Sequence, residues 1–397
     1  MTNIQRFSRH GRRALLSALL LMALLLGLCG CSRDGASDGK ALEPDPAVRS
    51  AISDELTYQN SMKLSYAKQF AVDYFEEGSC LITTLSGRRY YLGDVPSQGL
   101  PAGITVLKTP VDRVYMAGTA TMDMFLACGA LDTVRFSSLR QGDWKLPEAA
   151  EAMERGDILY AGKYSAPDYE LLKKGKCGLA LENTMIYHSP AVIEKLEQLG
   201  IPVFVDEASR EASPEARMEW VKVYGLLTGR ETEADKAFRA QLKEFPAKGD
   251  ETAAKDRPTV AFFSLRSNET VSVRRATDYV PYMIDLAGGE YLFNDLGADD
   301  PDSNRSTQVI SMEEFFTRAK DADYLIYNST IGGEVPSLRQ LLKDAPVLKD
   351  CAAVKAGRVY CTTADLYQHS MSQGTFVKDL HTMLTGGGTM TYLFALK

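Results

Sequence analysis

Residues 213–245 read SPEARMEWVKVYGLLTGRETEADKAFRAQLKEF, and this stretch decides how the chain is organised. It has no proline after Pro214, and its apolar residues recur at roughly helical spacing. Gly225 and Gly229 weaken a helix here by about 1 kcal/mol each relative to alanine. A helix of this length would reach about 45 Å, because each residue adds about 1.5 Å. The stretch therefore predicts one long rigid helix, over residues 213–247, that joins two bodies.

The segments on both sides of this helix alternate between strand-like and helix-like patterns. Before it, the strands DTVRFSS, CGLALE and IPVFVD alternate with helix-like segments such as LPEAAEAMERGD and SPAVIEKLEQLG. After it, PTVAFFSL, DYLIYNS and GRVYCTT alternate with ATDYVPYMIDLAGG and VPSLRQLLKDAP. Short links between such elements are typical of α/β lobes with mostly parallel sheets. We therefore predict one α/β lobe at residues 59–212 and a second at 248–397, with a hairpin or meander at residues 70–92 of the first.

The first 58 residues predict an export signal and a tether. Ala14 to Leu28 is an apolar run of about 15 residues, which is short for a bilayer span of roughly 20 residues. Four arginines and no acidic residue precede it, as in a secretory signal over residues 1–30. The run ends in LCGC and resembles a bacterial lipobox, which implies lipidation of Cys31, although an uncleaved signal anchor is the alternative. Residues 31–58 are rich in Gly, Ser, Asp and Pro and predict a flexible tether on the outer face of the cell membrane.

Charge and cysteine usage exclude several classes of protein. The chain has 45 basic and 52 acidic residues, a net charge of −7, and the four signal arginines leave 41 basic residues and −11 after cleavage. Such an acidic body argues against nucleic acid as a partner. No cysteine pair has the C-x-x-C spacing of zinc ribbons or thioredoxins. Cys351 and Cys361 either form a local disulfide or are buried free thiols.

No motif selects an enzyme or a bound metal. The sequence contains no H-E-x-x-H and no G-x-S-x-G motif. It also lacks the phosphate-binding motifs G-x-x-x-x-G-K-[ST] and G-x-G-x-x-G. Beyond the signal, its histidines are His188, His369 and His381, and His381 lies inside the predicted last helix. A zinc-binding protein needs about three histidines plus a carboxylate. We therefore expect neither catalysis nor an intrinsic cofactor or metal. A surface hydrolase with scattered catalytic residues remains the alternative from another class.

Four motifs in order, with the predicted helix between the second and third, carry a family resemblance. They are PVDRVYMAGTATMDMFLACGALDTV, APDYELLKKGKCGLALE, YMIDLAGGEYLF and VISMEEFFTRAKDADYLIY. From about Pro110 to the C-terminus, the chain resembles the lipoprotein substrate-binding proteins of ABC importers for iron–siderophores, haem and cobalamin. The resemblance implies the class III periplasmic-binding-protein fold, with two Rossmann-like lobes. The chain departs from the family pattern at Cys177-Gly178 and Ala322-Asp323, where Pro-Asp is usual.

The resemblance also implies partners and docking residues. In that family one glutamate on each lobe docks into arginine pockets of the membrane permease, and the motifs place these at Glu170 and Glu313, with Glu314 as a rival. A carboxylate at the start of a helix is stabilised by the helix dipole and can form a bidentate pair with a guanidinium. We therefore expect a monomer that delivers its cargo to an ABC permease with its ATPase. A lipoprotein that senses a solute would show the same features.

The ligand is expected in the cleft between the lobes, where loops follow the carboxyl ends of the strands. Arginines among aromatic side chains suit an anionic, partly apolar chelate. A ferric siderophore is the preferred cargo, and haem, which needs an axial His, Tyr or Met, or cobalamin are the alternatives. The expected ligand-binding residues are Thr119, Thr121, Met122, Arg135, Phe136, Tyr187 and His188 on the first lobe, and Ser264, Arg266, Arg274, Arg275, Tyr279, Tyr367 and His369 on the second.

Overall fold

The computed structural model describes residues 52, 54–245, 257–298 and 305–397. The predicted signal peptide, Cys31 and most of the predicted tether lie outside these residues. The tether was expected to extend to residue 58, but Ile52 is already buried and a strand begins at Tyr58. Within the described part of the chain, no helix is both long enough and apolar enough to cross a bilayer.

The first lobe is built on a five-stranded sheet in which every strand pair is parallel, as predicted. One face packs against α3, α4 and α8, and the other against α5 and α6. The strands, in sheet order, are β12 (Val203–Asp206), β11 (Leu179–Asn183), β6 (Val114–Met116), β7 (Val134–Ser137) and β8 (Leu159–Tyr160). The helices are α3 (Thr119–Ala127), α4 (Pro147–Glu154), α5 (Tyr169–Lys174) and α6 (Pro190–Gln198), and a small hairpin of β9 (Gly162–Lys163) and β10 (Ala166–Pro167) precedes α5.

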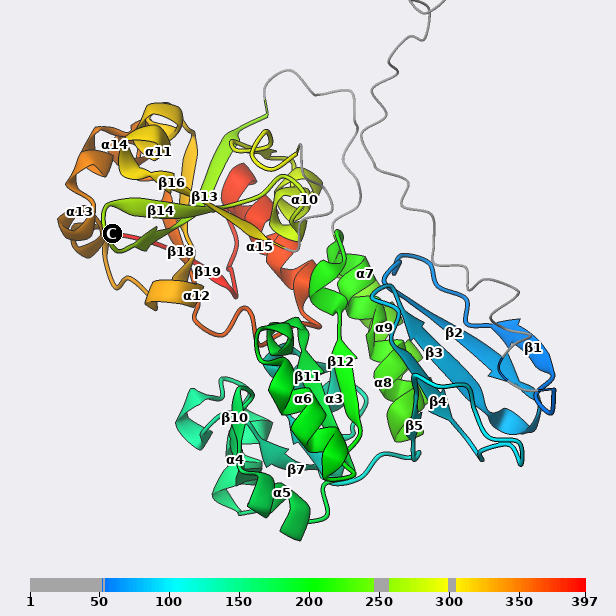
Figure 1. The fold of residues 1–397 in the computed structure, drawn as a ribbon. Helices are drawn as coiled ribbons and strands as arrows, with labels where there is room; N and C mark the ends of the chain where they lie inside the picture. The colour runs from blue at the N-terminus through cyan, green and yellow to red at the C-terminus, as the bar shows by residue number, and fades with distance from the viewer. Residues whose placement is uncertain (1–51, 53, 246–256, 299–304) are drawn as a thin grey trace, which may run out of the picture. The chain divides into compact units, whose positions relative to one another are not determined.

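The second lobe has a separate sheet with a parallel centre and antiparallel strands on both sides (Figure 1). The central strands are β13 (Thr259–Arg266), β17 (Tyr324–Tyr327) and β18 (Val359–Thr362), and β15 (Glu290–Tyr291) also runs parallel to β13. The antiparallel strands are β14 (Thr270–Arg274), β16 (Thr307–Ser311) and β19 (Leu393–Ala395). The helices are α10 (Tyr279–Leu286), α11 (Met312–Ala319), α12 (Ser329–Gly332), α13 (Leu338–Asp344), α14 (Ala352–Lys355) and α15 (Gln373–Thr385).

The prediction of one long rigid helix over 213–247 is wrong. The segment forms three helices: α7 (Pro214–Glu219), α8 (Val221–Thr228) and α9 (Glu231–Leu242). Gly229 ends α8 in the left-handed conformation, with φ of 68°. α9 then turns back along α8, and a Cβ on Gly225 would lie 2.5 Å from the Cβ of Ala234. The two glycines therefore allow a helical hairpin (Figure 1), and α9 alone, about 18 Å long, leads toward the second lobe.

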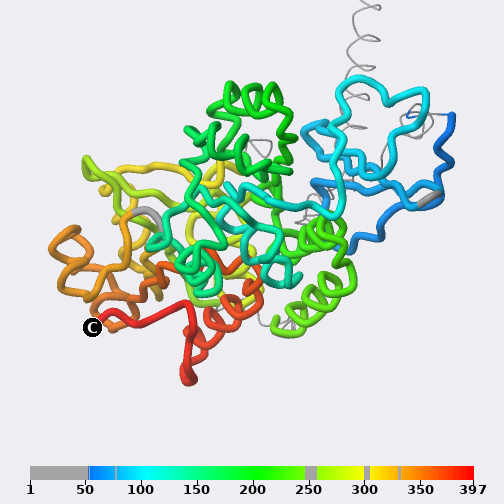
Figure 2. Tube along the Cα trace, turned by 90° about the horizontal axis from the view of Figure 1, so that it is seen from below, coloured from blue at the N-terminus to red at the C-terminus, as the bar shows by residue number. Residues whose placement is uncertain are grey.

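An additional five-stranded sheet precedes the first lobe and was predicted only in part. Its strands are β1 (Tyr58–Ser61), β2 (Phe70–Phe75), β3 (Cys80–Thr84), β4 (Arg89–Leu92) and β5 (Ile104–Leu107), in sequence order across the sheet. The predicted meander corresponds to β2, β3 and β4, which are antiparallel. Figure 2 shows this sheet in blue to cyan, and its inner residues share a hydrophobic core with the first lobe. We call it the N-terminal sheet.

The N-terminal sheet is joined to the first lobe by packing and by two buried carboxylates. Phe70 packs edge-on against Trp220, with ring centroids 4.8 Å apart. The carboxylate of Glu219 accepts hydrogen bonds from the backbone N–H groups of residues 65, 66 and 67, at 2.7 to 3.1 Å. Glu211 accepts those of residues 68 and 69, at 2.9 to 3.1 Å. Five consecutive N–H groups ahead of β2 are thus satisfied by two side chains around α7, which fixes the sheet in place.

The cysteines of the described residues are free and buried. This holds for Cys351 and Cys361, so the structure has buried thiols where a local disulfide was the other possibility. Burial raises the pKa of both thiols to about 11, which keeps them protonated and unreactive at neutral pH.

Candidate functional site

The carboxyl ends of the parallel strands of the first lobe meet at one edge of its sheet, as expected for a ligand site. Contacts with the second lobe are made at this edge. The loop after β18, residues 367–371, supplies several of them, and we call it the strap. Gln368 donates to the carbonyl of Asp143 (3.0 Å) and accepts from the N–H of Lys145 (2.8 Å). Both lobes therefore contribute groups to the same region.

The strap also reaches helix α3. Ser370 Oγ donates to the carbonyl oxygen of Ala120 over 2.6 Å, and the N–H of Met371 donates to Asp123 Oδ2 over 2.8 Å. The Met371 side chain is buried in the core of the first lobe. The second lobe is therefore fixed to the first by both polar and apolar contacts.

Three of the predicted ligand-binding residues of the second lobe lie together. Arg274 donates to the Tyr367 hydroxyl over 2.6 Å, and its guanidinium is 3.7 Å from the carboxylate of Asp278. Burial alone would lower the pKa of Arg274, but Tyr367 and Asp278 raise it above its ordinary value, so it remains a cation. Tyr279 lies in the same cluster, and the guanidinium carbon of Arg217 sits 3.6 Å from its ring centroid. This contact joins α7 of the linking segment to the second lobe.

A second cluster lies at the ends of β11 and β12. The Tyr187 hydroxyl donates to Glu207 Oε1 over 2.7 Å. The guanidinium carbons of Arg88 and Arg210 lie 5.8 and 5.6 Å from the centre of the Tyr187 ring. Burial raises the pKa of Tyr187, and the bond to Glu207 adds to this, so the hydroxyl stays protonated as a donor. We call Arg88, Tyr187, Glu207 and Arg210 the Tyr187 cluster.

The sequence patterns did not identify four arginine or aromatic residues at this edge: Arg88, Arg140, Tyr160 and Arg210. Arg140 and Tyr160 follow β7 and end β8, and the guanidinium carbon of Arg140 lies 4.4 Å from the Tyr160 ring centroid. Arg140 and Arg210 each follow a predicted strand, which could have identified them, whereas the strand that ends at Tyr160 was not predicted. Arg88 could not have been found, because nothing in the sequence shows that the turn between β3 and β4 approaches Tyr187.

Several more predicted ligand-binding residues are buried, as Arg274 and Tyr279 are, and the prediction is corrected for those that belong to the core. Met122 and Phe136 are core residues. Thr121 is buried and donates to Asp206 Oδ2 over 2.6 Å, so its hydroxyl serves the fold. Ser264 and Arg275 are also buried. These side chains follow the strands in sequence but point toward the packed helices and loops.

The remaining predicted residues have varied surroundings. Thr119 begins α3 and is half-buried, His188 is exposed beside the Tyr187 cluster, and Arg266 is exposed at the end of β13. His369 is half-buried, with its Nε2 atom 3.5 Å from the carboxylate of Asp365 and its ring tilted by 43° to that of Tyr392.

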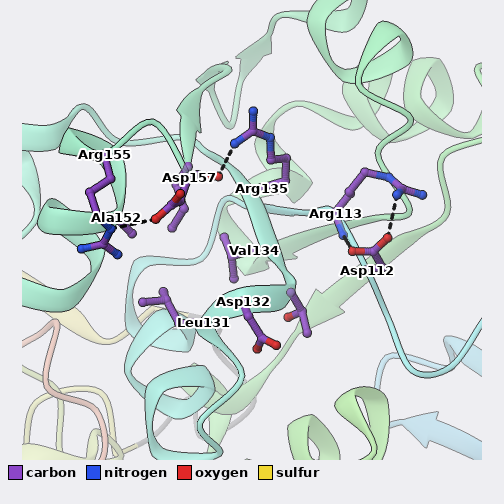
Figure 3. A pocket seen from close by; sticks show the side chains of 11 residues that line it. Asp112, Arg113, Leu131, Asp132, Val134, Arg135, Ala152, Arg155 and Asp157 are labelled. Carbon is purple, nitrogen blue, oxygen red and sulfur yellow. Dashed lines mark hydrogen bonds and ion pairs between the residues drawn. The ribbon is translucent and has the colours of Figure 1, made fainter.

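Arg135 lies at the opposite edge of the sheet, in a pocket at the amino ends of β6, β7 and β8 (Figure 3). The pocket has a volume of about 510 Å³. Arg135 donates to the carbonyl oxygens of Gly156 and Asp157, so it closes the turn before β8. Arg113 and Arg155 each pair with an aspartate, at 2.7 and 2.8 Å. The pocket contains as many aspartates as arginines, which gives it no net charge to select an anion.

Glu182, near the end of β11, is the most unusual buried group at the ligand edge. Its side chain is 1 % exposed, and its Oε1 atom has no hydrogen-bond partner in the structure. Burial raises its pKa from 4.5 to about 8. It lies on the face of the sheet that packs against α5 and interacts electrostatically with Tyr115 and Tyr169. Glu182 is therefore a neutral acid at pH 7.

Both predicted docking glutamates are exposed in the first turn of a helix. Glu170 lies in α5, where Asp168 caps the helix by accepting from the N–H of Leu171 over 2.9 Å. Glu313 lies in α11, where Ser311 accepts from the N–H of Glu314 over 3.0 Å. Each carboxylate thus faces solvent near the positive end of its helix dipole.

These observations define the class of protein: two α/β lobes with separate sheets, joined by a short helical segment and meeting at the carboxyl edge of the first lobe. A family model for periplasmic binding proteins matches residues 118–366, and the chain belongs to this family. The match begins just before α3, so the N-terminal sheet lies outside it.

Sequence relatives and solved structures agree with this assignment. A lipoprotein of Methanocaldococcus jannaschii is 23 % identical over 410 residues, which cover 97 % of this chain and all of the relative. A periplasmic binding protein from Veillonella parvula superposes with a TM-score of 0.56 at 18 % identity, over 69 % of this chain and 91 % of that one. A periplasmic haem-binding protein from Pseudomonas aeruginosa gives a TM-score of 0.55 at 16 % identity, over 72 % and 98 % of the two chains. Both superpositions show the shared fold.

Proposed function

We propose that this protein is the extracytoplasmic, lipid-anchored solute-binding component of an ABC importer, and that its cargo is an anionic chelate of the ferric-siderophore type. The observation that carries the proposal is the pairing of guanidinium groups with aromatic rings where the lobes meet. Arg274 with Tyr367 and Arg140 with Tyr160 offer charge for carboxylate or catecholate oxygens and flat surfaces for apolar rings. Membership of the periplasmic binding protein family supports a role in binding solutes.

The mechanism we propose is capture without a chemical step. The ligand binds at the carboxyl edge of the first lobe, a small tilt of the lobes encloses it, and the closed form presents Glu170 and Glu313 to the permease. An arginine side chain stays charged at any physiological pH. Recognition of the chelate by these arginines therefore does not depend on a change in their protonation. Haem is the second candidate, because the exposed His188 lies beside the Tyr187 cluster and could act as an axial ligand.

The proposal predicts a saturable change in tryptophan fluorescence on binding. Trp144 lies in the loop that the strap contacts and donates to Ser137 Oγ, over 3.0 Å, at the end of β7. Titration with a ferric tris-catecholate, haemin and cobalamin in parallel should give the tightest binding for the ferric chelate. Trp144→Phe should remove most of the signal, whereas Trp220→Phe, which alters a residue buried beside the N-terminal sheet, should retain it. No saturable signal with any of the three would refute the proposed cargo class.

The docking role predicts a separation of binding from uptake. In Glu170→Ala/Glu313→Ala, ligand affinity should stay within about twofold of the wild type, because both carboxylates are exposed and outside the ligand clusters. Uptake in cells that carry the matching permease should fall about tenfold or more, since each lost buried charge pair costs over 1.4 kcal/mol.

Glu148→Ala is the matched control, because Glu148 is likewise exposed in the first turn of a helix, α4. The same measurements on Glu314→Ala decide between Glu313 and its neighbour. If the double variant loses ligand affinity in step with uptake, the two glutamates belong to the ligand site and the docking assignment is wrong.

A further inference from the structure

The N-terminal sheet contributes directly to the Tyr187 cluster. Arg88 follows the turn between β3 and β4, and its guanidinium carbon is 5.8 Å from the Tyr187 ring centroid, with Arg210 contributing the second cation at 5.6 Å. The pKa of Tyr187 is raised chiefly by burial, and Ser86 and Arg88 of this turn act in the opposite direction. A segment outside the family match therefore reaches the edge where the family fold holds its ligand.

The turn that carries Arg88 is held firmly. The N–H of Leu85 donates to the carbonyl of Gln69 over 2.8 Å, and the N–H of Gly87 donates to the carbonyl of Thr84 over 2.9 Å. Gly87 has a φ of +85°, which a residue with a side chain rarely adopts. Leu85 is 52 % exposed at this turn. The turn thus presents an apolar side chain close in sequence to a cation, with little freedom to lose on binding.

The Tyr187 cluster has more positive than negative charge. Its one carboxylate, Glu207, is fully buried, accepts from Tyr187 and lies 3.4 Å from Arg210. The Arg88 guanidinium forms hydrogen bonds with the hydroxyl groups of Tyr187 and Tyr90. The Arg210 Nε–H is buried and has no acceptor. Two guanidinium groups against one carboxylate leave a surplus positive charge and an unused donor, which is the chemistry of an anion site.

We propose that the N-terminal sheet forms a third wall of the ligand site, in which Arg88 and Arg210 hold an anionic oxygen of the chelate against the Tyr187 ring. This inference rests on the proposed solute-binding function and adds to it a specificity-determining residue from outside the two lobes. The ligand class is a chelate with peripheral carboxylate or catecholate oxygens beside an apolar surface, which Leu85 would contact. For a ligand without such oxygens, this wall should not increase the binding affinity.

The test compares Arg88 with its neighbour in sequence. Arg89 is the next residue, but its Nη2 donates to the carbonyl of Ala102 over 3.2 Å, at β5 and away from Tyr187. Arg88→Ala should weaken binding of a ferric tris-catecholate by about 10- to 100-fold, the range for a lost hydrogen bond to a charged group. Arg89→Ala should change it by less than about twofold. Arg88→Lys should recover part of the affinity, because it restores the charge without the planar fork.

The wild-type protein is titrated first, and circular dichroism confirms that each variant folds. If the wild type binds the ferric chelate and Arg88→Ala binds it as well as Arg89→Ala does, the third wall is wrong while the proposed function stands. If the wild type binds neither the ferric tris-catecholate nor haemin nor cobalamin, the proposed function is wrong and this inference falls with it. If Arg88→Ala loses affinity and Arg89→Ala does not, the result supports both the third wall and the proposed function.

Discussion

Glu219→Ala is expected to destabilise the protein by about 4 kcal/mol, which is large for a single substitution. The side chain is fully buried, and its carboxylate accepts from the N–H groups of residues 65–67 and from Lys222 Nζ at 2.7 Å. Alanine would leave these donors without the carboxylate at a position where the Glu219 side chain is fully buried. Urea unfolding, monitored by circular dichroism at pH 7, measures the loss.

Glu233→Ala is the control for this experiment, because Glu233 is exposed on α9, and its substitution should change the free energy of unfolding by less than about 0.5 kcal/mol. Glu219→Gln preserves the shape of the side chain and two acceptor lone pairs. Its loss in free energy of unfolding should therefore lie between those of Glu219→Ala and Glu233→Ala. A loss below about 1 kcal/mol in Glu219→Ala would show that the N-terminal sheet is held by apolar packing alone, with no need for the carboxylate.

Glu182→Gln is expected to remove a strong pH dependence of stability. In the folded protein the pKa of Glu182 is raised from 4.5 to about 8, so between these values the folded state keeps a proton that the unfolded state has lost. The stability that this group contributes is therefore complete below about pH 4.5 and declines as the pH rises to about 8. Integrated over this window, the decline is on the order of 4 kcal/mol.

The measurement is the difference in free energy of unfolding between wild type and Glu182→Gln, from urea titrations at several pH values. The difference cancels the titration of all other groups. Near pH 4.5 the two proteins should have similar stability, and above pH 8 the glutamine variant should be the more stable, because it carries no charge to bury. Glu194→Gln, an exposed substitution on α6, should show no such trend. A difference that is flat across this range would mean that Glu182 is ionised in the folded protein.

The sequence predicted the elements of the two lobes well, because each strand and helix carries its own local pattern. β7, β11, β12, β13, β17 and β18 all lie where alternation and apolar runs placed them. The prediction of one continuous linking helix was wrong for a physical reason. Gly225 and Gly229 were treated as weak points of one helix, whereas Gly229 ends α8 and Gly225 allows α9 to pack against it. Propensity alone does not distinguish a tolerated glycine from one that makes a close contact possible.

The candidate site was harder to predict, because it depends on which side of a loop faces the sheet. Arg274, Tyr279 and Tyr367 were expected on ligand-binding loops of the second lobe, and the structure places them in one cluster. Thr121 and Met122 follow a strand in the same way, yet the first turn of α3 points them into the core. Arg88 comes from a sheet about 100 residues earlier in the chain than Tyr187, and only the packing of that sheet brings the two together.

The strap has a thermodynamic consequence for how the lobes separate. To part the lobes there, the thioether of Met371 must leave the core of the first lobe, at a cost of about 2 kcal/mol, and the hydrogen bonds of Gln368 and Ser370 must break. These contacts are made by the chain's own groups. Contact between the lobes at the strap therefore does not require a bound ligand, and any opening of the lobes there has to overcome this free energy.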